Sequence, residues 1–341
     1  MNLQEGISIV MCCYNSTSVI KPTLQHLAAL DLPSGWPVEL IIIDNASTDG
    51  TSDFALKLWK DNGDPFAMII HAEPNKGLIF ARNKGVKVSR FEIILFVDDD
   101  NWLARNYLIR LQQLFKRFPS VAAFGGLNKP VFETKEPFWF ETFQQSYAVG
   151  KLSKGFNEPE EIGLFGAGMA VRKTALNDLY LSQFKSRLIG RKGDSLTSGE
   201  DYELCKALKL AGWQIIFAPE LSLEHFISAR RLTWDYFRKL NMGISRSIYI
   251  FLAYEYWIGL GRGVNPYIAG IKYSWLFLLI KKVIKAFLLK MLLIVNPELS
   301  KEGSTVLIDY ERTKIVVSDL FFKRKEFIDV KKSIGKAKWK L

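Results

Sequence analysis

The chain of 341 residues is long enough for one large domain or two modest ones with a substantial core. Hydrophobic residues make up 48% and charged residues 24%, which excludes an intrinsically disordered chain. The net charge of +11 belongs mostly to the C-terminal part, because residues 262–341 hold 17 Lys and Arg against 7 Asp and Glu. The three cysteines provide neither a disulfide framework nor metal-ligand spacing. The first residues lack a basic segment followed by an apolar run, so we expect no signal peptide and a cytoplasmic protein.

Apolar runs typical of buried strands alternate with helical patterns along the first part of the chain. The predicted strands cover residues 7–11, 38–43, 67–70, 91–97 and 121–124, with glycines 125 and 126 closing the last one. The predicted helices follow these strands and end near residues 30, 58, 88 and 118. This alternation predicts an α/β fold in which helices cover both faces of a parallel sheet.

The stretch Phe91–Asn101 joins a buried strand to three consecutive carboxylates, Asp98, Asp99 and Asp100. Adjacent like charges repel one another, and buried carboxylates are costly without a partner, so a divalent cation is the expected partner. Asp98 and Asp100 point to the same side of an extended chain and can share a metal ion. The alternative is a solvated turn that caps a helix beginning near Ala104.

Polar side chains also follow the first two predicted strands. Tyr14 and Asn15 come after the first strand, and Asp44 ends the second. Ligands of parallel sheets bind beyond the carboxyl ends of the strands, so we expect these residues and the three aspartates to share one crevice. The chain contains neither G-x-G-x-x-G after the first strand nor G-x-x-x-x-G-K-[ST]. A nucleotide in this crevice would therefore be held by side chains and a metal ion.

Residues 273–295 are the most hydrophobic stretch of the chain, and Lys281, Lys282, Lys285 and Lys290 interrupt it. No uninterrupted apolar run reaches the roughly 18 residues that a membrane-spanning helix needs. On a helical wheel the lysines occupy about half of the circumference and leave an apolar face opposite. Together with the basic charge, this predicts a helix that lies in an anionic membrane surface. The alternative is a helix whose apolar face packs on the rest of the protein with the lysines outward. Nucleic-acid binding is not expected, because no known module accompanies the basic tail.

Motifs of the chain resemble, in their order, those of the family 2 glycosyltransferases, which are inverting enzymes of the GT-A fold. The motifs are Ser8–Asn15, Ile41–Thr51, Asn75–Gly85, Phe96–Asn101 and Gly199–Trp213. The resemblance covers roughly residues 6–245. It implies a Rossmann-like, mostly parallel sheet flanked by helices in a catalytic domain of residues 1–245. A helical, basic extension of residues 246–341 would follow.

The resemblance implies a donor site for a nucleotide sugar. Asp44 would contact the base, and Tyr14 and Asn15 would help to line its pocket. Arg82 would lie near the nucleotide, although it could instead be a surface residue of its helix. Asp99, between the two metal-binding aspartates, would belong to the same donor site.

The resemblance also implies a metal site and a catalytic base. Asp98 and Asp100 would form the D-x-D pair that binds Mg²⁺ or Mn²⁺, with Asp100 facing the metal and Asp98 nearer the ribose. His225 would approach the metal or the diphosphate, or else be a hydrogen-bonded structural histidine. Asp201 would be the general base next to Glu200. Without the resemblance, these two carboxylates could simply cap the helix that they open.

Two glycine-bearing stretches would surround this site. Residues 193–199 form a polar, Gly-rich loop that could close over the bound donor and exclude water. Residues 163–171 are small and apolar, and they form either a close-packed strand or a floor under the acceptor.

Together with the resemblance, the sequence predicts a metal-dependent inverting glycosyltransferase that works on the inner face of the cell membrane. It would move one sugar from a nucleotide diphosphate donor, with a UDP-sugar favoured, to a saccharide or lipid-linked saccharide in polysaccharide or lipopolysaccharide biosynthesis. Processive relatives carry Q-x-x-R-W after the Glu-Asp motif, and this chain does not, which favours transfer of a single sugar. The alternatives are a nucleotide-sugar-binding protein without catalysis and a membrane-associated scaffold.

Overall fold

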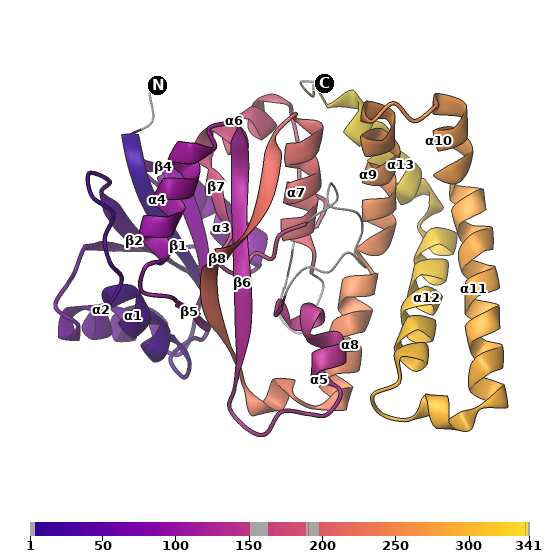
Figure 1. Cartoon of the computed structure of the whole chain (residues 1–341), viewed down its shortest axis with the longest axis horizontal. Coiled ribbons are helices and arrows are strands. Elements are labelled where there is room, and N and C mark those ends of the chain that lie inside the picture. The colour runs from indigo at the N-terminus through magenta and orange to yellow at the C-terminus, as the bar shows by residue number, and fades with distance from the viewer. Residues whose placement is uncertain (1–3, 151–162, 189, 191–197, 338, 340–341) are drawn as a thin grey trace.

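The computed structural model describes residues 4–150, 163–188, 190, 198–337 and 339. In these ranges the chain forms one eight-stranded sheet, with helices on both faces and a group of C-terminal helices to one side of it (Figure 1). The strands lie in the order β3-β2-β1-β4-β7-β6-β8-β5. Their bounds are β1 Gln4–Cys13, β2 Val38–Asp44, β3 Ala67–Ala72, β4 Phe91–Asp98, β5 Asn101–Leu103, β6 Val121–Phe132, β7 Ala170–Arg172 and β8 Gln214–Ile227.

The helices fall into a group that flanks the sheet and a C-terminal group. The flanking helices are α1 Ile20–Ala28, α2 Thr51–Asp61, α3 Leu78–Val88, α4 Tyr107–Arg117, α5 Phe140–Phe143, α6 Lys173–Leu181 and α7 Glu200–Leu210. The C-terminal helices are α8 Trp234–Ser245, α9 Ile248–Gly261, α10 Pro266–Lys272, α11 Trp275–Val295, α12 Thr305–Phe322 and α13 Arg324–Lys336.

The central strands are buried on both faces, as their continuous apolar runs predict. Along β1, Ile9 and Met11 belong to the core shared with α1, α2 and α4. Val10, between them, belongs to the core shared with α3, α6 and α7. Successive side chains of a strand point to opposite faces, so one strand contributes to both cores. The predicted α/β fold with a covered sheet is confirmed.

The carboxyl ends of the strands that carry the polar motifs lie side by side. In the parallel pairing of β1 with β2, Cys13 is opposite Asp44, and in the pairing of β1 with β4, Cys12 is opposite Asp98. The pairs β2–β3 and β6–β8 are parallel too, whereas β4–β7, β6–β7 and β5–β8 are antiparallel. The sheet is therefore mostly parallel, with the antiparallel pairs confined to its second half.

The structure corrects two details of the predicted elements. Strand β6 does not end at glycines 125 and 126 but continues through them to Phe132. Gly126 lies so close to β8 that a Cβ atom would be 1.7 Å from the Leu221 carbonyl oxygen, so only glycine fits there. The acidic turn is followed by the short strand β5, and α4 begins only at Tyr107. The alternative in which the aspartates cap a helix near Ala104 is therefore wrong.

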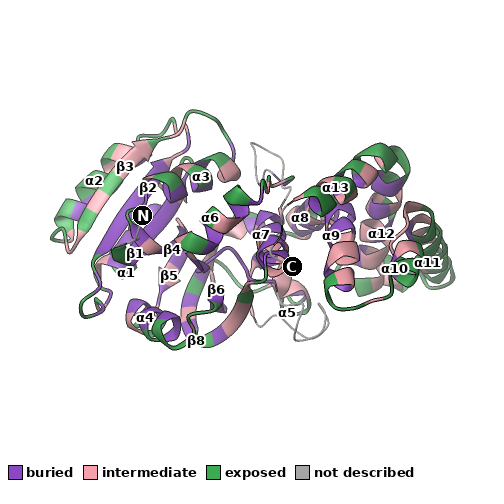
Figure 2. Ribbon diagram, turned by 90° about the horizontal axis from the view of Figure 1, so that it is seen from above, coloured by how far each residue is buried: buried purple, intermediate pink, exposed green. Residues whose placement is uncertain are grey.

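The C-terminal helices share a core with the sheet domain. Helix α9 packs on α7, α12 on α8, and α13 on α9. The apolar core that begins at Val10 of β1 continues through Ile250 of α9 to Val316 of α12. Helix α11 packs mainly on α12 and lies at the outer edge of the molecule (Figures 1 and 2). The predicted boundary between residues 245 and 246 falls between α8 and α9, and it stays a prediction.

None of the described helices combines the length and the apolar character that crossing a membrane requires.

Candidate active site

Hydrogen bonds join the loops that follow β1 and β2. The Asn15 backbone N–H donates to Ser47 Oγ at 3.0 Å, and Asn15 Oδ1 accepts from the Thr48 N–H at 2.8 Å. Asn15 has a φ of 53°, in the left-handed region that Asn tolerates better than most residues. The Thr17 hydroxyl donates to Asp49 at 2.8 Å. The side chain predicted to line the base pocket thus also holds two loops of the crevice together.

Tyr14 and Asp44 lie where these two loops begin, since Cys13, which precedes Tyr14, is opposite Asp44 in the β1–β2 pairing. Tyr14 is 47% exposed, and Lys76 Nζ lies 3.4 Å from its hydroxyl. Asp44 Oδ1 accepts from the Ser47 N–H at 2.9 Å, and Asp44 Oδ2 accepts from the Ser52 hydroxyl at 2.5 Å. Burial raises the pKa of Asp44, but these hydrogen bonds outweigh it and lower the pKa below its ordinary value. Asp44 is therefore an ionised acceptor at neutral pH.

The three consecutive carboxylates turn to three different partners. The Asp99 carboxylate accepts a hydrogen bond from the Ser16 hydroxyl, and the Asp99 carbonyl accepts from Thr23 Oγ1 at 2.6 Å. Burial raises the pKa of Asp99 to about 7, helped by the charges of Asp100 and Asp98 and opposed by the Ser16 hydrogen bond. Asp99 therefore fastens the turn to the β1 loop, while its two neighbours face buried arginines.

Asp100 faces Arg231 and His225. Arg231 Nη1 lies 2.9 Å and His225 Nε2 3.4 Å from Asp100 Oδ2. The antiparallel register pairs Asn101 of β5 with His225 of β8, which brings the imidazole to the acidic turn. Both basic side chains are buried, and His225 Nδ1 and Arg231 Nε have no hydrogen-bond partner among the described residues. The structure thus assembles a buried cation, a carboxylate and an imidazole at one point of the crevice.

Asp98 faces Arg82, which connects the acidic turn to the Glu-Asp motif. Arg82 Nη2 lies 3.9 Å from Asp98 Oδ1, and Arg82 Nη1 lies 3.4 Å from Glu200 Oε1. The guanidinium also stacks over the Phe96 ring, 5.3 Å from its centroid. A Cβ atom at Gly166 would lie 2.5 Å from Arg82 Nη2, so the glycine leaves the space that this arginine fills. Because Arg82 is buried, the alternative of a surface helix residue is wrong.

Asp201 lies in the first turn of α7. Its Oδ2 accepts from the Gly166 N–H at 2.7 Å, and its Oδ1 accepts from the Tyr202 N–H at 2.9 Å. Burial, together with the charge of Glu200, raises the pKa of Asp201 to about 6, against the opposing effects of Arg82 and the two N–H donors. A carboxylate with a pKa near neutrality is a better proton acceptor than an ordinary surface aspartate. Residues 193–197 of the predicted closing loop lie outside the described residues.

The donor atoms of the crevice fit a hard divalent cation only in part. Among the described residues, no three His, Cys, Asp or Glu side chains form a cluster that could hold a metal ion unaided. Mg²⁺ is usually held by one or two carboxylates together with substrate phosphates, and Mn²⁺ also favours oxygen ligands. Asp98 and Asp100 provide such carboxylates, and His225 adds a nitrogen close to Asp100. The site therefore fits an ion whose coordination a bound diphosphate completes.

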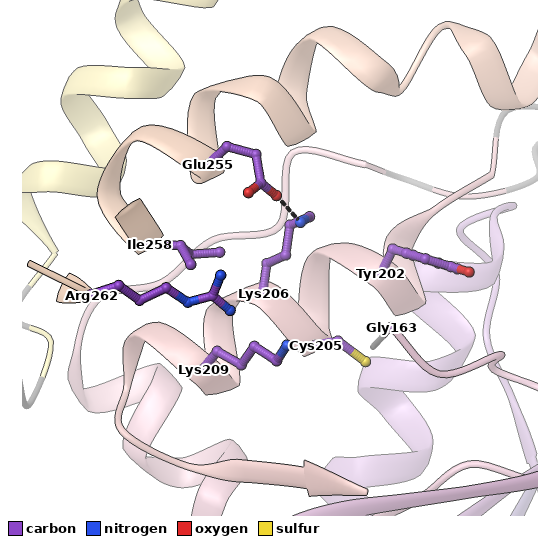
Figure 3. Close-up of a pocket in the computed structure, with 8 residues that line it drawn as sticks. All are labelled: Gly163, Tyr202, Cys205, Lys206, Lys209, Glu255, Ile258 and Arg262. Carbon is purple, nitrogen blue, oxygen red and sulfur yellow. Dashed lines mark hydrogen bonds and ion pairs between the residues drawn. The ribbon is translucent and has the colours of Figure 1, made fainter. Parts of the chain in front are cut away.

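A separate small pocket lies between α7 and α9 (Figure 3). Lys206 of α7 forms an ion pair with Glu255 of α9 in this pocket, and Lys209 and Arg262 add further positive charge. None of the predicted site residues lines it. The polar residues of the crevice are therefore not part of this pocket.

Three residues of the crevice were not predicted. Arg231 is in contact with Asp100, Ser16 holds Asp99, and the buried Asn101 accepts from the Asp98 N–H at 3.0 Å. Asn101 also donates to Asp100 Oδ1 at 3.0 Å, so it shapes the turn from both sides. The only sequence signal for Arg231 is the pair of arginines that follows the His225 strand, and a basic pair by itself is more often a solvated surface feature.

Solved structures show the class of fold. The mannosyltransferase PcManGT from Pyrobaculum calidifontis, in complex with GDP-Man and Mn²⁺, matches with a TM-score of 0.60 and 14% identity over 95% of this chain and 89% of its own. Residues 1–349 of Staphylococcus aureus TarS, in complex with UDP-GlcNAc, match with a TM-score of 0.51 and 16% identity over 96% and 90% of the two chains. At such identities the likeness concerns the fold alone. The fold is that of GT-A glycosyltransferases.

The sequence identifies the family. Residues 8–180 match the family described as Glycosyl transferase family 2, and the chain belongs to that family. It is 25% identical over 178 residues to the poly-beta-1,6-N-acetyl-D-glucosamine synthase of Staphylococcus epidermidis, a match that covers 51% of this chain and 41% of the relative. The synthase of the same name from Staphylococcus aureus strain COL is 29% identical over 122 residues, which cover 36% and 28%. The matches thus span less than half of each relative. The family to which the chain belongs is described as one of glycosyl transferases.

Proposed function

We propose that this glycosyltransferase moves one sugar from a nucleoside diphosphate sugar, with a UDP-sugar favoured, to a saccharide acceptor with inversion at the anomeric carbon. The observation that carries the proposal is the arrangement around Arg82. This buried side chain contacts Asp98 of the acidic turn on one side and Glu200, next to Asp201, on the other. It thereby joins the group that would hold the leaving diphosphate to the group that would take the acceptor's proton.

The acceptor activation is assigned to Asp201. The acceptor hydroxyl oxygen attacks C1 of the donor sugar from the face opposite the phosphate, and its proton passes to the Asp201 carboxylate. The bond between C1 and the phosphate oxygen breaks, and the nucleoside diphosphate leaves with the electron pair. Glu200, with one carboxylate oxygen toward Arg82 and the other accepting from the Gly199 N–H at 3.1 Å, positions Arg82 rather than taking a proton.

The leaving diphosphate is assigned to the acidic turn. Asp98, Asp100 and His225 would hold Mg²⁺ or Mn²⁺, which supplies positive charge to the leaving oxygens when bound. Arg231 and Arg82 add two buried guanidinium groups that balance the carboxylates before the donor arrives. Asp44, Tyr14 and Asn15 would contact the nucleoside at the entrance of the crevice.

The acceptor is assigned to a saccharide, free or lipid-linked, in the biosynthesis of a polysaccharide or lipopolysaccharide. The names of the curated relatives support a polysaccharide product. The absence of Q-x-x-R-W from the sequence supports transfer of one sugar at a time.

The donor is tested by calorimetry with a panel of UDP-, GDP- and dTDP-sugars, each with Mn²⁺ and with EDTA. We expect one nucleotide class to bind in the presence of Mn²⁺ and to lose most of its affinity in EDTA. Asp100→Asn is expected to weaken binding of that donor, while Asp31→Asn, at an exposed ion pair with Arg105, leaves it unchanged. Binding that is the same in Mn²⁺ and EDTA would refute the metal site, and no binding by any sugar would refute the donor site.

A further inference from the structure

The least exposed side of helix α11 carries Leu278, Leu289 and Lys282, while Lys281, Lys285 and Lys290 are exposed. Leu278 is its only described side chain that is buried, and it lies on the same side as Lys282. Lys285 Nζ pairs with Asp309 of α12 at 2.7 Å, and burial lowers the pKa of Lys282. The apolar face opposite the lysines is exposed and not buried against the rest of the protein, so that part of the alternative is wrong, although three of the four lysines do point outward.

The side of α11 that points away from α12 presents a continuous apolar stripe, called here the α11 outer face. Its members have exposed fractions between 41% and 61% and follow one another at spacings of four and three residues. They are Ile280, Ile284, Phe287, Met291 and Ile294. At about 100° per residue, this spacing keeps all five on one side of the helix. Figure 2 shows α11 exposed at one end of the molecule.

Neighbouring α10 extends the apolar surface. Tyr267, Ile268 and Ile271 of α10 are 85%, 60% and 65% exposed. Helices α10 and α11 follow one another and are in contact. Large contiguous apolar surfaces on a folded protein mark interaction sites, because leaving them in water is costly.

The charges carried by the two helices of this surface have a single sign. Residues 262–295 contain Arg262, five lysines and no Asp or Glu. By helical spacing, Lys281 lies on one flank of the α11 outer face and Lys290 on the other, and both are exposed. A second copy of this chain would bring cations against cations, so charge complementarity favours an anionic partner.

We propose that the α11 outer face and the adjoining α10 surface dock on an anionic lipid bilayer. The apolar stripe would enter the boundary between headgroups and acyl chains, and Lys281 and Lys290 would reach the lipid phosphates from its two flanks. Because no described helix is suited to span the bilayer, α11 lies along the surface. The proposal does not depend on the identity of the donor or the acceptor.

The first test is sedimentation of the full chain with vesicles of phosphatidylcholine alone and of phosphatidylcholine mixed with phosphatidylglycerol. We expect binding to the mixed vesicles, weaker binding to the neutral ones, and release from the mixed vesicles at high salt. Equal recovery in the supernatant with and without mixed vesicles would overturn the proposal.

Charge placed in the stripe tests the docking surface itself. Phe287→Glu should weaken vesicle binding at least about tenfold, because it removes a large apolar group from the lipid and adds a repelled charge. The matched control is Leu181→Glu on α6, which changes an apolar side chain that is 78% exposed on another surface and should leave binding unchanged. Phe287 is 61% exposed, so the unfolding midpoint should be the same in both variants. Equal binding by Phe287→Glu and the parent chain would overturn the proposal.

The flanking lysines test the electrostatic part. Lys281→Gln with Lys290→Gln should weaken binding to the mixed vesicles about 25-fold, since each lysine near an anionic surface contributes about fivefold. Lys57→Gln with Lys60→Gln on α2 removes the same charge elsewhere and should have a much smaller effect.

Light scattering tests whether a second copy of the chain, and not lipid, covers the α11 outer face. A dimer that Phe287→Glu dissociates, without vesicle binding by the parent chain, would assign the face to a second copy and overturn the lipid proposal.

Discussion

The acidic crevice and the α11 outer face differ in what they bury. The crevice buries charged side chains, whereas the α11 outer face exposes apolar ones to water. In the crevice, Arg82, Arg231 and Glu200 are buried although they carry charge. On α11, Ile284 and Phe287 are exposed although they are apolar. The buried charges are compensated by partners within the chain, whereas nothing among the described residues covers the apolar stripe. The difference indicates that the charges of the crevice are already paired within the isolated chain. The apolar stripe of α11 would be covered only by a partner outside the chain, for which we propose a lipid bilayer.

The largest expected effect concerns the base in the crevice. Asp201→Asn should lower kcat by about 10²–10⁴-fold, because the amide cannot take the acceptor's proton. Donor affinity, measured by calorimetry, should change little. A variant that keeps more than a third of the parent kcat would show that Asp201 is not the base.

The next prediction tests whether the buried charges are truly compensated. Arg82→Met should lower the free energy of unfolding by about 3 kcal/mol, because it leaves Glu200 buried without its partner. Arg105→Met is the matched control, since the side chain of Arg105 is 78% exposed and its ion pair with Asp31 should contribute at most about 1 kcal/mol. Denaturant unfolding at pH 7 measures both. Equal losses would mean that burial does not distinguish these two ion pairs.

The pH dependence of turnover sharpens the assignment of the base. The Asp201 carboxyl has a pKa of about 6 and must be deprotonated to accept a proton. The ratio kcat/KM should therefore rise about tenfold from pH 5 to pH 7 and level off above. The residual rate of Asp201→Asn should be flat over the same range. A parent profile without this rise would contradict the assignment.

The smallest effect is expected on the inner side of α11. Lys282→Met should leave the free energy of unfolding unchanged or raise it by up to about 1 kcal/mol, because burial against α12 already disfavours the charged lysine. Lys281→Met, on the outward flank, should change it by less than about 0.5 kcal/mol. A clear loss of stability in Lys282→Met would mean that the buried charge is favourable where it lies.

Much of the first half of the fold and of the crevice could be predicted. The predicted strands at residues 38–43 and 91–97 correspond to Val38–Asp44 and Phe91–Asp98 in the structure. Apolar runs of this length report burial on both faces, and parallel strands bring their carboxyl ends to one edge. Asp44 and Asp98 end two of these strands, so a parallel sheet predicts that both lie at the same edge of it.

The second half of the sheet could not be predicted in the same way. Strand β7 has three residues, Ala170–Arg172, and pairs antiparallel with both β4 and β6. So short a segment has no periodicity of its own, and its pairing depends on strands that are distant in the sequence. The continuation of β6 beyond Gly126 likewise depends on a partner that is distant in the sequence. Gly126 lets the backbone of β8 approach closely at Leu221, which local propensity does not predict.

The sequence by itself determined the order of the strands and helices at the start of the chain, the acidic turn and the two faces of α11, because these depend on spacing along the chain. Only the tertiary structure decided that Arg82 contacts Glu200, 118 residues away, and that Arg231 contacts Asp100. It also decided which face of α11 points inward. A helical wheel defines two faces, but the one that becomes buried depends on the surface that α12 and the rest of the chain present to it.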